Sequence, residues 1–204
     1  VATRWGRRDT IPLLHHLPTL TSFFRSSFDQ DLERAAVLAM EYGDAASLVP
    51  VSRVHPQAFL NVALLETERV DAVRRATEDC ARLVAEMAWA PSLEAVVDQS
   101  RAQLALATGD LEGAEVAATD LLDRAVANDF AIAEVDALEL LGVAAHLAGS
   151  PERSHQLLAS AGAARDRLGY RHVMVAPRHL HDRALAEVPS PTSSPAARLA
   201  SRTS

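Results

Sequence analysis

Apolar residues recur every three or four positions through most of the chain, a spacing that predicts amphipathic helices. The helices expected from this spacing cover residues 29–42, 56–68, 70–88, 93–107, 111–127, 131–148 and 151–168, with a last one inside 173–187. Glycine, proline or capping residues stand between most of them, as at the ends of helices. The pattern predicts an all-α fold with essentially no strand.

Two stretches of the chain, residues 104–114 and 143–154, repeat the same local design forty residues apart. In each, an apolar helix runs into a glycine (Gly109 or Gly149), a capping residue follows, and a second amphipathic helix begins. A fixed period of this size is typical of helical-repeat proteins. The chain is therefore expected to be an α-solenoid of antiparallel helix pairs, TPR-like, with repeats of about 40 residues.

Three aromatic residues support the same register. Trp89, Phe130 and Tyr170 stand 41 and 40 residues apart, each just after the second helix of a predicted pair. A large side chain at that place is expected to wedge between successive pairs, which is a structural role.

Composition divides the chain into three parts. Residues 1–28 include Pro12 and Pro18 within a short apolar stretch, which predicts an irregular N-terminal segment. Residues 29–188 carry the helical pattern and form the predicted repeat domain. Residues 189–204 are rich in Pro, Ser and Ala and cannot bury enough apolar surface to fold, so this tail is expected to be disordered.

Charge is unevenly distributed. The net charge is −7, yet residues 1–25 and 171–204 each carry +3, so residues 26–170 carry −13. An acidic middle repels phosphate backbones, so no direct nucleic-acid binding is expected there. On one predicted helix, Asp120 and Arg124 stand at i,i+4 and are expected to form an exposed ion pair.

Few residues offer chemistry. The chain has no lysine, hence no phosphate-loop lysine, and neither a CxxC nor an HExxH motif. Cys80 is the single cysteine, which fits a reducing, cytoplasmic compartment. There is no apolar run long enough to span a membrane. We therefore expect no enzyme activity, no cofactor and no metal. The alternative is a small all-helical metal-binding protein or enzyme that uses His172, His179 and His181, with Asp182 as a further ligand.

Candidate binding residues are polar positions on otherwise apolar first helices. If Ala102 and Gly142 are close-packing positions, the groove of a solenoid would be lined by Gln99, Gln103, Asp136, Glu139 and His146. These five residues are the predicted binding surface for a protein partner or a small effector. The alternative is that they face solvent and have no role.

Several segments together resemble the tetratricopeptide-like region of LuxR-type, MalT-like ATPase regulators, which are common in actinobacteria. The likeness covers about residues 100–185, and more weakly 56–99. It is carried by residues 105–114, 135–142, 148–149, 157–169 and 181–186. The resemblance implies a repeat array between a nucleotide-binding domain and a helix-turn-helix, with a role in sensing an effector or a partner protein.

This chain departs from that family pattern in three ways. Ser154 stands where such repeats prefer alanine, the period is nearer 40 than 34, and the chain has neither an ATPase motif nor a convincing helix-turn-helix. ATP hydrolysis and DNA binding are therefore not carried over.

The leading hypothesis is a non-enzymatic interaction or effector-sensing module, part of a bacterial transcriptional regulator. A further alternative is a remnant without independent function. The start at Val1 fits either a piece of a longer protein or a GTG start codon.

Overall fold

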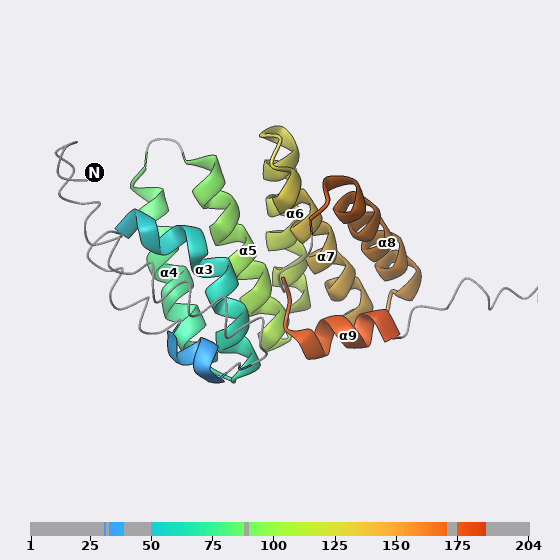
Figure 1. The fold of residues 1–204 in the computed structure, drawn as a ribbon, viewed down its shortest axis with the longest axis horizontal. Coiled ribbons are helices and arrows are strands. Elements are labelled where there is room, and N and C mark those ends of the chain that lie inside the picture. Colours follow the sequence, from blue (N-terminus) through green and yellow to red (C-terminus); the bar gives the residue numbers. More distant parts are fainter. Residues whose placement is uncertain (1–30, 32, 39–49, 88–89, 171–174, 187–204) are drawn as a thin grey trace, which may run out of the picture.

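The computed structural model describes residues 31, 33–38, 50–87, 90–170 and 175–186. Within these ranges every regular element is a helix and none is a strand, so the predicted all-α fold is confirmed. Residues 33–38 are helical. The later helices are α3 (Pro50–Glu66), α4 (Val70–Ala85), α5 (Pro91–Thr108), α6 (Leu111–Ala127), α7 (Ala131–Leu147), α8 (Pro151–Leu168) and α9 (Arg178–Ala186) (Figure 1). None of the described helices is long and apolar enough to cross a membrane. The predicted segments 1–28 and 189–204, together with Trp89, lie outside the described residues.

The helices form two interleaved series with one spacing. Helices α3, α5 and α7 begin 41 and 40 residues apart, and so do α4, α6 and α8. From α3 to α8 each helix packs against its neighbours in the chain, and α5 also packs against α3 and α7. In Figure 1 these helices lie side by side, and α9 runs crosswise below the lower ends of α7 and α8, which it contacts. The spacing of the helix starts agrees with the predicted period.

The turns between helices contain residues with a left-handed backbone. After the first helix of each pair these are Glu68 (φ 59°), Gly109 (φ 76°) and Gly149 (φ 74°). After the second helix they are Asp129 (φ 57°) and Gly169 (φ 63°). Glycine adopts this conformation without the steric cost that a Cβ brings. Glu68 therefore occupies the turn position that Gly109 and Gly149 occupy after α5 and α7, and Asp129 the position that Gly169 occupies after α8.

Replacing Asp129 with Gly is expected to stabilise the protein by about 0.5 kcal/mol. The change removes the strain of the left-handed backbone in the folded state, and this gain exceeds the opposing gain in freedom of the unfolded chain. The matched change Gly169→Ala is expected to cost about 1 kcal/mol. No heavy atom lies within 4 Å of a Cβ built on Gly169, so only its backbone conformation opposes the change. Urea unfolding measures both values. A loss of stability in D129G as large as that in G169A would contradict the argument.

Two helices begin and end as predicted because their signals are local. Before α6, the Asp110 carboxylate accepts a hydrogen bond from the backbone N–H of Gly113 at 2.9 Å. Helix α8 starts at Pro151, whose missing N–H is not needed at the first helical position. Ser150 precedes it as predicted, but the Ser150 side chain makes no capping hydrogen bond.

Other predicted limits are wrong by a few residues. Helix α3 begins at Pro50, not at Pro56, so residues 50–55 extend the predicted helix at its start. Both prolines carry the same start signal, and the chain uses the earlier one. Helix α4 ends at Ala85, not at residue 88, and α5 starts at Pro91, two residues early. Helix α9 starts at Arg178, directly after Pro177, and lies inside the predicted range 173–187.

A core of leucine, valine and alanine joins α5 to α8. Leu121, Leu140 and Val143 are fully buried, as are Ala102 and Ala118. The predicted close-packing position on α7 is confirmed, because a Cβ on Gly142 would lie 2.7 Å from Cγ of Leu158 on α8.

Gly142→Leu is expected to destabilise the protein by about 1–3 kcal/mol, because Leu158 and its helix would have to move. Gly162 on α8 is the matched control, since nothing lies within 4 Å of a Cβ built there. Gly162→Leu is expected to be neutral or stabilising because leucine is the better helix former. Equal stability changes for the two variants, measured by thermal unfolding, would show that α7 and α8 are not closely packed at Gly142.

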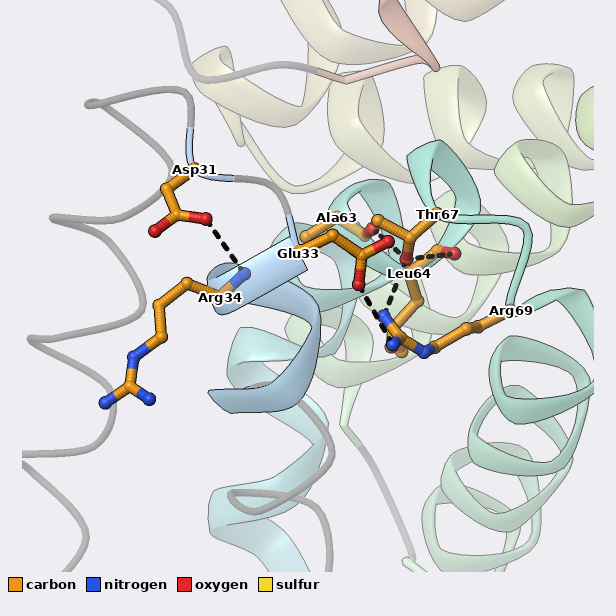
Figure 2. Close-up of polar contacts among 7 residues, drawn as sticks. All are labelled: Asp31, Glu33, Arg34, Ala63, Leu64, Thr67 and Arg69. Atoms are coloured by element: carbon orange, nitrogen blue, oxygen red, sulfur yellow. Dashed lines mark hydrogen bonds and ion pairs between the residues drawn. The ribbon is translucent and has the colours of Figure 1, made fainter.

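Arg69 connects the N-terminal helical residues to the turn between α3 and α4. Its guanidinium donates to Oε2 of Glu33 at 3.1 Å and to Oγ1 of Thr67 at 2.9 Å (Figure 2). On the other side of residues 33–38, Asp31 accepts a hydrogen bond from the backbone N–H of Arg34 at 3.1 Å. This helical segment is thus placed against the first helix pair by an exposed ion pair as well as by the buried Ala35 and Ala36.

Candidate functional site

Four of the five predicted binding residues are buried in the structure. The exposed fractions are 7% for Gln99, 0% for Gln103, and 3% for Asp136 and Glu139. His146, near the end of α7, is partly buried. The four residues therefore do not form an open surface. They belong to a polar cluster, defined here as Gln57, Asn61, Gln99, Gln103, Asp136, Glu139, Arg165, Tyr170 and His181.

One part of the cluster is made of side-chain amides. Gln57 donates to Oδ1 of Asn61 at 2.7 Å, and Asn61 donates to Oε1 of Gln103 at 3.4 Å. Nε2 of Gln103 then donates to two backbone carbonyls, those of Ala58 at 3.0 Å and Val175 at 2.8 Å. Both hydrogens of the Gln103 amide and its oxygen are therefore used. Gln103 holds α3, α5 and the segment before α9 together.

The other part of the cluster surrounds two carboxylates on α7. Gln99 donates to Oδ2 of Asp136 at 3.4 Å, and the Tyr170 hydroxyl lies 3.5 Å from Oδ1. The Arg165 guanidinium, from α8, donates to Glu139. Nε2 of His181, from α9, lies 3.3 Å from the other oxygen of Glu139.

Burial, and after it the neighbouring Glu139, raise the pKa of Asp136 from 3.8 to about 7. Arg165 and the hydrogen bonds from Gln99 and Tyr170 oppose the rise without cancelling it. Burial and the nearby Asp136 also raise the pKa of Tyr170. One arginine balances the charge of only one of the two buried carboxyl groups, so protonation of Asp136 is favoured. The cluster can hold this proton near neutral pH.

Local helix geometry explains how these residues come together. Gln57 with Asn61 and Gln99 with Gln103 are i,i+4 pairs, and each pair lies on one face of its helix. The two amide pairs are 42 residues apart, nearly one repeat, which is a signal that sequence reasoning missed. Arg165, Tyr170 and His181 were missed as partners because they reach the cluster from other elements, and no local pattern records such contacts.

The alternative hypothesis was a metal site formed by the C-terminal histidines. Among the described residues, no group of three His, Cys, Asp or Glu side chains is placed to hold a metal ion. His179 is exposed, whereas His181 lies between Glu139 and Asp182, whose Oδ1 is 3.5 Å from Nδ1. His172 lies outside the described residues.

A second polar region lies between α4, α5 and α6, where two adjoining hollows of about 230 and 340 Å³ share Asp98 and Arg101 in their lining. Arg124 donates to Oδ2 of the buried Asp98 at 2.9 Å and also to Glu94, so the expected pair with Asp120 is replaced by partners on α5. Burial raises the pKa of Asp98, although Arg124 opposes the rise. The positive charge of Arg124 is balanced by the carboxylates of Asp98 and Glu94, which favours a structural role for this polar region.

Comparison with family models, with curated proteins and with solved structures finds no match.

Proposed function

We propose that this chain is a non-enzymatic protein-interaction or effector-sensing module, built as a TPR-like α-solenoid of antiparallel helix pairs. Support for the solenoid comes from the spacing of the helix starts and from the contacts of each second helix with the first helix of the next pair. The resemblance to MalT-like regulators further suggests a cytoplasmic role inside a bacterial transcriptional regulator.

The observation that carries the proposal is the way side chains of α5 and α7 hold a peptide segment, residues 175–186. Val175 is 2% exposed, and its carbonyl accepts a hydrogen bond from the buried amide of Gln103 at 2.8 Å. Backbone hydrogen bonds combined with apolar side-chain contacts are the usual means by which proteins recognise extended peptides. We call the surface around Gln103 and Glu139, which both contact residues 175–186, the segment-binding face. Gln99 and Asp136 lie next to them on the same two helices. In this proposal the face binds a segment of a partner protein in the same manner.

A peptide-display library of random 12-residue sequences, panned against the full chain, tests the proposed function. Enriched peptides are expected to bind the wild type and to lose about tenfold in affinity, or 1.4 kcal/mol, in Gln103→Met. Gln156→Met is the matched control because Gln156 is exposed on α8. Circular dichroism of each variant establishes that it is folded. Enrichment of no peptide, or equal binding to Q103M and Q156M, would contradict the proposal.

A further inference from the structure

We propose that residues 175–186 are a removable occupant of the segment-binding face, and that the partner is a segment of another protein with the same three features. These features are an extended apolar stretch, a short helix directly after it, and a cationic or imidazole side chain that meets Glu139. This inference rests on the proposed function and specifies its ligand.

The extended stretch supplies the first feature. Val175 and Ala176 are each 2% exposed and belong to the apolar core shared by α5, α6 and α7. Pro177 is also buried and has no N–H that would need a partner there. The face thus recognises small apolar side chains and one carbonyl, that of Val175. These requirements are met by many short apolar sequences followed by proline.

Helix α9 is attached more lightly than the helices beneath it. Among its side chains only Ala184 is described as fully buried, at 1% exposure, while Leu180 and His181 are partly buried. The remaining described side chains are exposed, and they are His179, Asp182, Arg183, Leu185 and Ala186. Helix α9 packs mainly on α7, which is itself buried between α6 and α8. Removing α9 therefore leaves the packing of α6, α7 and α8 in place.

Charge supplies the third feature. Glu139 places a buried carboxylate on the face, and Arg165 donates to one of its two oxygens. The second oxygen of Glu139 meets Nε2 of His181 at 3.3 Å. A charged hydrogen bond to a carboxylate is stronger than a neutral one. A partner segment with arginine or lysine at the position of His181 is therefore expected to bind more tightly than the chain's own segment.

A fluorescein-labelled peptide with the sequence of residues 175–186 is the probe, and full-length chains are the receptors. Ala184→Asp places a charge at the buried position of α9 and should release the chain's own segment. Leu185→Asp is the matched control, because Leu185 is 47% exposed. Fluorescence anisotropy is expected to show about tenfold tighter peptide binding to A184D than to the wild type. L185D should bind as the wild type does.

A second variant and a second peptide make the test independent of the folding of A184D. Leu180→Ala removes an apolar contact of α9 without adding charge and should also strengthen peptide binding. A peptide with His181→Arg should bind A184D and L180A more tightly than the natural peptide, whereas His181→Glu should bind more weakly.

The outcomes separate the two proposals. Equal peptide binding to the wild type, A184D and L180A overturns this inference, and it leaves the proposed function standing if library peptides still depend on Gln103. Failure of the library as well overturns both. If the wild type forms dimers that exchange residues 175–186, the occupant is a second copy of the chain, which overturns the assignment to a different protein.

Discussion

Asp136→Asn is expected to raise the free energy of unfolding by about 2–4 kcal/mol at pH 8 and to change it little at pH 4. The pKa of Asp136 is raised from 3.8 to about 7 in the folded protein, mainly by burial. The folded state therefore binds the proton more tightly than the unfolded state does. The contribution of Asp136 to stability is therefore full below pH 4 and is lost as the pH rises from about 4 to about 7. Asparagine has the size of the protonated side chain but does not ionise.

Urea unfolding of the wild type and D136N between pH 4 and pH 8 measures this effect. The wild-type stability should fall relative to that of D136N until the pH passes about 7, and the two curves should then run parallel. Asp123→Asn is the matched control, because Asp123 is exposed on α6 and its replacement should not alter the pH dependence. Parallel curves for the wild type and D136N over the whole range would show that Asp136 is not buried as described.

Arg165→Met is expected to cost about 3 kcal/mol at pH 8, because it removes the guanidinium that donates to the buried Glu139. The same guanidinium also lowers the pKa of Asp136, so its loss leaves two adjacent buried carboxylates with less compensation. At pH 5 the cost in stability should be smaller, because Asp136 then carries a proton and no longer repels Glu139.

Two further variants separate the charge effect from simple loss of packing. Arg167→Met is the matched control, because Arg167 is exposed on the same helix. The double variant Glu139→Gln, Arg165→Met should recover at least half of the lost stability, because the unpaired charge is removed with its partner. If R165M is no less stable than R167M, the ion pair between Arg165 and Glu139 does not form.

The sequence predicted the helices well wherever the signals are local. Asp110 before α6 and Pro151 at the start of α8 fix those helices at the predicted residues. The start of α3 was misplaced because Pro50 and Pro56 carry the same signal, and the choice between them depends on packing. The Gly142 contact was also predictable, since a glycine inside an apolar helix indicates a close neighbour.

The candidate site was predicted in part. Gln99, Gln103, Asp136 and Glu139 stand out in the sequence as polar residues on apolar helices, and they lie in one cluster. Their burial was not predictable, because it depends on elements distant in the chain. The amide of Gln103 meets the carbonyl of Val175, 72 residues later. Local sequence patterns do not reveal contacts between residues so far apart in the chain. Polar residues on an open face and polar residues beneath a covering segment therefore have the same appearance in the sequence.

Gln103 and Glu139 hold residues 175–186 on the segment-binding face. Hydrogen–deuterium exchange of the full chain, read by mass spectrometry on peptides that cover 175–186, tests this arrangement most directly. Slow exchange at these residues in the wild type, together with faster exchange in Gln103→Met and no change in α6, is the result we predict. Complete exchange of residues 175–186 within seconds in the wild type would contradict the claim.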